Sequence, residues 1–272
     1  MPKDAHPELD LSPLLDEVGQ RKFQSLIGCL QWCVTLGRFD IGFCVMTMSR
    51  FRGCPREQHL VWLGNIFGYL RKYPDGAIRF RTHIPDHESV HGIPRDIDWA
   101  DSGYADAVEE IPDNAPVPKG KPVRQTSFFD ASLAFCHASG ASAMGDCHLV
   151  NGTPVAWKST KIPTVVSSTY AAELIAHRAC ADEVAAVRYE LRMLGAPIDG
   201  PAWVFGDNQS EINGTGNPAG RLKISGSTAV TAADQYFLLW LQTDWITNNA
   251  IDRLFLFRVR LSITWLALTI SP

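Results

Sequence analysis

Three acidic residues lie in sequence settings where carboxylates can gather around a metal ion. Asp130 closes the run Gln125–Asp130, and Asp207 closes a second apolar run, Ala202–Asp207. Glu173 lies near the start of a stretch with helical periodicity. Two strand ends and one helix start can bring distant carboxylates together, and such hard oxygen ligands suit Mg²⁺ or Mn²⁺. A pair of such ions a few ångströms apart is the machinery of phosphodiester hydrolysis.

Each of the three carboxylates also has an ordinary structural explanation. Asp130 could cap the turn after its strand, and Asp207 could cap the helix that follows it. Glu173 could be a first-turn glutamate that the helix dipole favours. The residues alone leave both explanations open.

Positioning these residues requires an α/β segment, which the pattern predicts from residue 123 onward. Alternating or apolar runs predict strands over 124–131, 141–150, 154–158 and 202–205, with Asn151-Gly152 as the turn between the second and third. Core-facing periodicity predicts a long helix over 168–194, which Gly195 and Pro197 end, and a short helix follows Asp207.

The remaining chain divides into three further predicted segments. Residues 1–82 carry helical periodicity, with helices from Arg21, over 41–49 and over 57–71, and a short alternating strand over 77–82. Residues 83–122 are rich in Pro and Gly and read as a linker or irregular arm, so we place a domain boundary near residue 122. Residues 223–272 form an apolar tail with little charge.

Composition and charge limit the classes of function. The 272 residues are 46% hydrophobic and 20% charged, which predicts one large or two modest folded domains. The net charge of -4 offers no general attraction to phosphates, so nucleic-acid binding would require a local basic patch. Seven cysteines in no tight framework indicate reduced thiols and an intracellular protein, cytoplasmic or nuclear. The N-terminus has no apolar region typical of a secretory signal.

The apolar tail does not predict a membrane span. Arg258 and Arg260 interrupt the run Leu254–Ile270, which is also short for a span. A buried strand or an exposed apolar tail is the preferred interpretation, and no membrane partner is expected.

Ordered sequence blocks run from about residue 6 to about residue 222. The N-terminal blocks are Arg21-Lys-Phe-Gln-Ser-Leu-Ile-Gly-Cys-Leu-Gln-Trp, Arg38-Phe-Asp-Ile, Met48-Ser-Arg-Phe and Ile66-Phe-Gly-Tyr-Leu-Arg-Lys-Tyr. The later blocks are Phe129-Asp130-Ala, Pro154-Val-Ala-Trp-Lys-Ser, Ser167-Ser-Thr, Ala172-Glu173-Leu-Ile-Ala, Arg188-Tyr-Glu-Leu-Arg-Met-Leu-Gly and Gly206-Asp207-Asn-Gln-Ser. In this order the blocks resemble copia-type LTR-retrotransposon polyproteins. The resemblance covers the thumb and connection of a reverse transcriptase in residues 1–82 and a ribonuclease H domain in residues 123–222.

The resemblance implies a fold, an activity and a role for each acidic residue. The implied fold is a ribonuclease H-like mixed sheet flanked by helices, in which the first and fourth strands are neighbours and the helix N-terminus lies over them. Asp130, Glu173 and Asp207 match the Mg²⁺-binding catalytic positions. One ion would generate a hydroxide and the other would stabilise the leaving 3′ oxygen. The implied substrate is the RNA strand of an RNA–DNA hybrid, which its 2′-OH distinguishes.

The chain departs from the family pattern at two places. The Tyr-x-Asp-Asp turn of the polymerase is absent from this sequence, so the palm would have to come from the rest of a polyprotein as a partner. After Leu222 no basic, His-containing continuation follows, and the fourth acidic ligand is unassigned. We hypothesise that residues 223–272 are frameshifted; if no other reading frame of the encoding DNA restores that continuation, the hypothesis is wrong.

Alternatives of other classes follow from the same residues. The chain could be a non-catalytic retroelement remnant that binds nucleic acid or protein, or another nuclease of the same superfold with different carboxylate spacing. Cys136-His137 and Cys147-His148 could hold zinc, although buried thiols beside surface imidazoles are the favoured interpretation. Basic residues in 50–81 could contact phosphates or simply be solvated.

Overall fold

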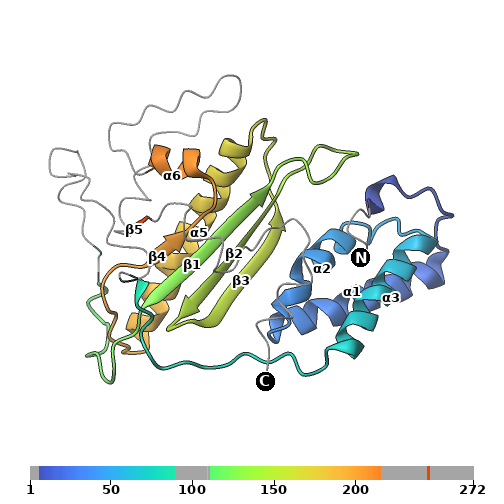
Figure 1. The fold of residues 1–272 in the computed structure, drawn as a ribbon. Coiled ribbons are helices and arrows are strands. Elements are labelled where there is room, and N and C mark those ends of the chain that lie inside the picture. Colours follow the sequence, from blue (N-terminus) through green and yellow to red (C-terminus); the bar gives the residue numbers. More distant parts are fainter. Residues whose placement is uncertain (1–5, 88, 90–108, 110, 216–243, 246–272) are drawn as a thin grey trace.

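The computed structural model describes residues 6–87, 89, 109, 111–215 and 244–245 (Figure 1). Within them, three helices precede a mixed sheet that is flanked by further helices. The expected architecture is therefore confirmed. Much of the arm predicted at 83–122 and most of the tail at 223–272 lie outside the described residues. Among the helices of the described chain, none combines the length and apolarity that a membrane span needs.

The N-terminal segment forms its own hydrophobic core. Its helices are α1 (Glu17–Thr35), α2 (Gly42–Ser49) and α3 (Glu57–Lys72), with short 3-10 turns at Pro7–Leu9 and Phe39–Ile41. Asp16 begins α1 by accepting a hydrogen bond from the Gly19 N–H at 2.7 Å. Phe23, Ile27 and Leu30, which follow one another at helical spacing in α1, are fully buried in a core shared with α2 and α3, and Leu26 and Val34 are partly buried beside them. All three predicted helices are confirmed.

The short strand predicted over residues 77–82 is wrong. The segment has no strand pairing, and Phe80 is 84% exposed, so its alternating pattern buries nothing. Instead, the Arg81 N–H donates to Thr153 Oγ1 at 2.7 Å, and that hydroxyl donates to the Arg79 carbonyl at 3.4 Å. The Thr153 side chain therefore holds this segment, in place of the backbone hydrogen bonds that a paired strand would make.

The sheet contains an antiparallel meander followed by parallel strands. Its strands are β1 (Gln125–Ser132), β2 (Ala143–Val150), β3 (Thr153–Lys161), β4 (Trp203–Phe205) and the two-residue β5 (Asp244–Trp245), in the spatial order β3-β2-β1-β4-β5. β2 is antiparallel to both β1 and β3, whereas β4 is parallel to β1 and β5 is parallel to β4. The crossover between β1 and β4 therefore brings two chain segments some 75 residues apart side by side (Figure 1).

The turn between β2 and β3 is the predicted Asn-Gly hairpin. Asn151 and Gly152 have φ values of 51° and 74°. Two successive positive φ angles are what a two-residue turn needs to match the twist of its strands, and Asn and Gly tolerate them best. Val150 consequently pairs directly with Thr153.

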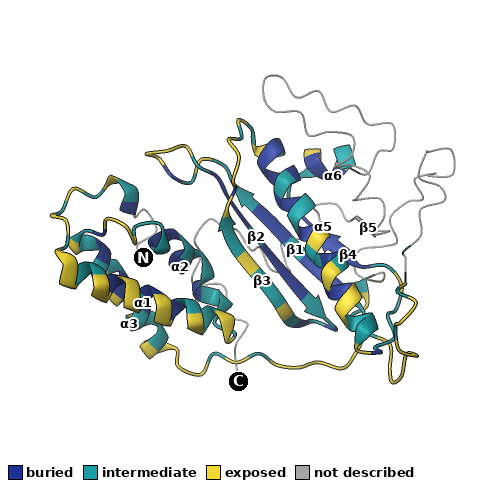
Figure 2. Ribbon diagram, turned by 180° about the vertical axis from the view of Figure 1, so that it is seen from behind, coloured by how far each residue is buried: buried dark blue, intermediate teal, exposed yellow. Residues whose placement is uncertain are grey.

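Helix α5 (Thr169–Met193) covers one face of the sheet, as Figure 2 shows from behind. Its inward residues Leu174, Ala181 and Val184 pack on Phe129 and Val204. Ser168 caps its start by accepting from the Ala171 N–H at 3.1 Å. At its end, Gly195 has a φ of 71°, and the Ala196 N–H bonds the Leu191 carbonyl at 2.9 Å, which stops the helix as predicted.

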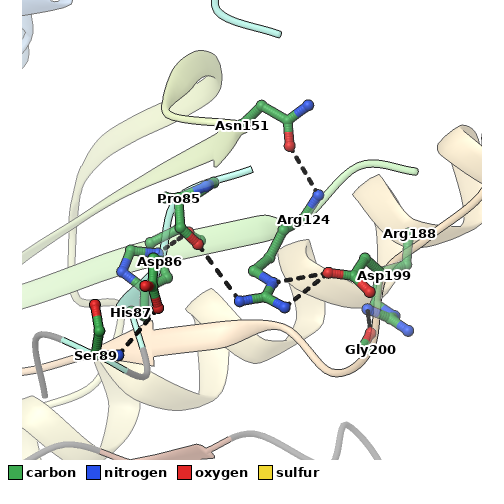
Figure 3. Close-up of polar contacts among 10 residues, drawn as sticks. Pro85, Asp86, His87, Ser89, Arg124, Asn151, Arg188, Asp199 and Gly200 are labelled. Carbon is green, nitrogen blue, oxygen red and sulfur yellow. Dashed lines mark hydrogen bonds and ion pairs between the residues drawn. The ribbon is translucent and has the colours of Figure 1, made fainter. Parts of the chain in front are cut away.

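An arginine anchors the start of β1, at the end of the strand away from Asp130. The Arg124 guanidinium donates to Asp199 Oδ2 at 2.7 and 3.2 Å and to the Pro85 carbonyl at 3.4 Å (Figure 3). The Arg124 N–H donates to Asn151 Oδ1 at 3.0 Å. One residue thus ties together the arm, the hairpin and the connection that leads to β4.

Several basic residues of the N-terminal segment have structural contacts. The Arg50 guanidinium lies 4.7 Å from the Phe135 ring centroid and donates to Cys136 Sγ at 2.7 Å. Arg56 bonds the Ser12 carbonyl. These two side chains therefore have structural contacts that hold loops in place.

Candidate metal centre

Asp130 and Asp207 come to one end of the sheet because β1 and β4 run parallel. Phe128 pairs with Phe205, and each phenylalanine is followed two residues later by one of the aspartates. Parallel neighbours in register carry equivalent positions to the same edge. Asp130 lies inside β1, opposite Gly145 of β2, and is 9% exposed.

Asp207 does not cap the helix that follows it. The cap of α6 (Gln209–Thr215) is Asn208, whose Oδ1 accepts from the N–H groups of Ser210 and Glu211 at 3.1 Å each. The structural explanation considered for Asp207 is therefore met by its neighbour, and the Asp207 carboxylate is available for another role.

Replacing Asn208 by Ala should destabilise the protein by about 1 kcal/mol, because two N–H groups at the start of α6 lose their acceptor. Asn208→Ser keeps a cap and should lose much less. Chemical denaturation of the two variants beside the wild type measures the difference. Equal stability of the Ala and Ser variants would show that α6 does not depend on this cap.

Glu173 lies in the second turn of α5, so it is not the first-turn glutamate of the structural explanation. The helix begins at Thr169 and has no acidic residue in its first turn. The Glu173 side chain points into the protein and is 6% exposed. The Ala131 backbone, next to Asp130, hydrogen-bonds the Glu173 carboxylate, whereas Glu173 Oε2 is buried and has no hydrogen-bond partner in the described part of the chain.

The three carboxylates converge. One oxygen from each of Asp130, Glu173 and Asp207 lies within 4.8 Å of the others. Burial raises the pKa of Glu173 to about 9, and the nearby charges of Asp130, Asp207 and Glu211 add to the effect. A buried acidic cluster of this kind costs free energy unless a proton or a cation neutralises it.

The residues fit a divalent metal ion. All the donors are carboxylate oxygens, which Mg²⁺ and Mn²⁺ prefer. The buried Glu173 Oε2 is an acceptor within the cluster that no described residue satisfies. A cation placed among the three groups would satisfy this acceptor and offset both the burial and the repulsion between carboxylates that together raise the pKa of Glu173.

The zinc alternative is not supported by the described residues. Among them, the acidic trio is the single group of His, Cys, Asp and Glu whose donor atoms approach one another closely enough. All seven cysteines are free, and Cys136 and Cys147 are buried as expected. The expected surface imidazoles are half right: His137 is exposed, but His148 is fully buried and bonds Ser127 Oγ at 2.8 Å.

A packed cluster under the carboxylates contains two polar residues that sequence reasoning missed. The Phe129 ring stacks on His177, with centroids 4.8 Å apart and planes 8° apart. His177 Nδ1 lies 2.5 Å from Glu211 Oε1, and both side chains are fully buried. One signal was available: His177 follows Glu173 by four residues, the spacing that places two side chains on one helix face. Glu211 was hidden because Asn208-x-x-Glu211 is typical of a capping box.

Fold and site together define an α/β protein with a mixed sheet, in which three carboxylates cluster at one end of the parallel strands β1 and β4. No family model matches the sequence. It is 25% identical over 155 residues to the putative transposon Ty5-1 protein of Saccharomyces cerevisiae, a match that covers 57% of this chain and 38% of the yeast protein. The chain is thus distantly similar to a retrotransposon protein, of which it spans well under half.

Similar solved structures are ribonuclease H proteins. RNase H1 of Halobacterium salinarum has a TM-score of 0.29 and 16% identity, covering 46% of this chain and 83% of that one. The N-terminal RNase H domain of a Mycobacterium tuberculosis protein, solved as a fusion with maltose-binding protein, has a TM-score of 0.31 and 17% identity, covering 48% and 87%.

Proposed function

We propose that this protein carries a copia-type ribonuclease H domain in residues 123–222, which hydrolyses the RNA strand of RNA–DNA hybrids. Residues 1–82 would be the thumb and connection of the preceding reverse transcriptase, with 83–122 as the arm between them. The observation that carries the proposal is the convergence of Asp130, Glu173 and Asp207 within 4.8 Å. The distant similarity to a transposon protein supports the retroelement origin.

In this proposal Asp130, Glu173 and Asp207 hold Mg²⁺ or Mn²⁺ in a two-ion site. The bound ions supply Lewis acidity and lower the pKa of a water molecule. Glu173 must give up its proton on binding, because burial raises its pKa to about 9 in the metal-free protein. The Ala131 backbone, which hydrogen-bonds the Glu173 carboxylate, then favours its ionised form. Asp130 on β1 and Glu173 on the covering helix are largely shielded from water, so their negative charge acts in a region of low dielectric.

The test is cleavage of a labelled RNA–DNA hybrid by the purified full chain with Mg²⁺. Asp130→Asn should lower the rate by about 100- to 1,000-fold, because the metal ion that would stabilise the charge of the transition state loses one of its carboxylate ligands. Asp182→Asn on the exposed face of α5 is the matched control and should cleave like the wild type. A chelator should abolish cleavage.

Three outcomes would contradict the proposal. Equal cleavage by the wild type and Asp130→Asn would assign the signal to a contaminant. Equal cutting of RNA–DNA hybrid and DNA duplex would favour another nuclease of the same superfold. Metal binding without any cleavage would support the second candidate, a non-catalytic retroelement remnant.

A further inference from the structure

The hydrogen bond between His177 and Glu211 joins the two helices that flank the carboxylate cluster. His177 lies on α5, four residues after Glu173, and Glu211 lies on α6, four residues after Asp207. The atoms His177 Nδ1 and Glu211 Oε1 are 2.5 Å apart, and both side chains are 0% exposed. The bond therefore fixes the distance between the element that carries Glu173 and the element that follows Asp207.

Helix capping does not explain Glu211. Its sequence position is the third of α6 after the Asn208 cap, where a glutamate commonly bonds back to the cap N–H. Here Oε1 faces His177, and Oε2 is buried with no hydrogen-bond partner among the described residues. Burying a carboxyl group with one oxygen unsatisfied costs free energy that an apolar side chain at this site would avoid. A contribution to stability therefore does not explain why a glutamate is buried at position 211.

The same pair is packed against the neighbours of the other two ligands. The His177 ring stacks on Phe129, which precedes Asp130. Phe129 in turn fills the space beside Gly206, which precedes Asp207, since a Cβ there would lie 2.4 Å from Phe129 Cζ. A displacement of His177 would therefore also shift residues that are next to the three carboxylates.

We propose that the buried His177–Glu211 hydrogen bond is a positioning element that holds Asp207 at metal-binding distance from Glu173. The inference rests on the proposed function, since it concerns the same metal site. His177 and Glu211 act through the three carboxylates and need not contact the metal or the substrate. Groups with this indirect role typically change metal affinity by about ten- to a hundredfold when they are lost.

The test compares two variants of the full chain by Mn²⁺ titration, with free Mn²⁺ counted by electron paramagnetic resonance. In Glu211→Gln the amide oxygen still accepts from His177, so affinity should stay within about threefold of the wild type. The double variant His177→Leu and Glu211→Leu removes the bond but fills the space with apolar atoms. Its metal-free stability should be equal or higher, because apolar replacement of a buried polar pair is often neutral or stabilising, whereas its Mn²⁺ affinity should fall by about tenfold or more.

We therefore expect the double variant to keep or gain stability while it loses Mn²⁺ affinity. A purely structural role would not produce this combination. A double variant that binds Mn²⁺ within about threefold of the wild type would overturn the inference and leave the proposed function intact. A wild type that binds no Mn²⁺ would overturn both. The exposed substitution Glu190→Ala on α5 is the matched control and should change neither quantity.

Discussion

Replacing Glu173 by Gln should strongly reduce hybrid cleavage and metal binding while it makes the metal-free protein more stable at neutral and alkaline pH. Burial raises the pKa of Glu173 from 4.5 to about 9, so the folded protein keeps this proton over a wide pH range. Gln is nearly the same shape as the protonated acid and carries no charge. We expect a rate loss of about 100-fold or more, because one of the three groups that stabilise the metal site is lost.

The sign of the pH dependence follows from proton linkage. Below about pH 4.5 both the folded and the unfolded chain carry the Glu173 proton, so the residue costs no stability. As the pH rises toward about 9 the unfolded chain releases this proton and the folded chain retains it, so stability falls; above that value there is no further fall. The slope is at most about 1.4 kcal/mol per pH unit.

Thermal denaturation of the wild type and Glu173→Gln from pH 5 to pH 9 measures this effect. Without metal, the difference in stability should grow with pH in favour of the variant. With Mg²⁺, only the wild type should gain stability, and the gain should increase with pH because binding displaces a proton. Parallel pH profiles for the two proteins would show that Glu173 is ionised in the folded state and that the cluster is looser than described.

Replacing Gly206 by Ala should damage both the fold and the site. A Cβ at this position would lie 2.4 Å from Phe129 Cζ and 2.9 Å from Cε1. The Phe129 ring cannot retreat easily, since it is 4% exposed and stacks on His177. Overpacking of this kind costs about 1 to 3 kcal/mol. Because Asp207 is the next residue, any shift that relieves the clash should also weaken Mn²⁺ binding.

Gly64→Ala is the control for this prediction. Gly64 lies in α3, and a Cβ there meets no atom within 4 Å, so the change should stabilise the helix slightly. Denaturant unfolding of both variants, beside their Mn²⁺ affinity, tests the contrast. A Gly206→Ala protein as stable as the wild type would mean that the Phe129 ring can move, and the packing argument for the site would be wrong.

Local sequence patterns predicted most elements of this fold because the tertiary environment of each element agrees with its local pattern. The periodic apolar residues of α1 and α5 are buried, and the Asn151-Gly152 turn adopts the positive φ angles that those two residues tolerate best. The strand expected over residues 77–82 failed for the complementary reason. Its alternation was as regular, but no neighbouring strand pairs with it, and a strand needs a partner to satisfy its backbone.

The sequence by itself determined which residue types were available for a metal site: three acidic groups at the ends of apolar runs or near a helix start. The tertiary structure alone decided that they meet, because convergence depends on the parallel pairing of β1 with β4 and on the packing of α5 across them. It also decided that Asn208 caps α6, and that Glu211 turns inward to His177. A capping glutamate and a buried one have the same local sequence, and only the side chain across the helix interface distinguishes them.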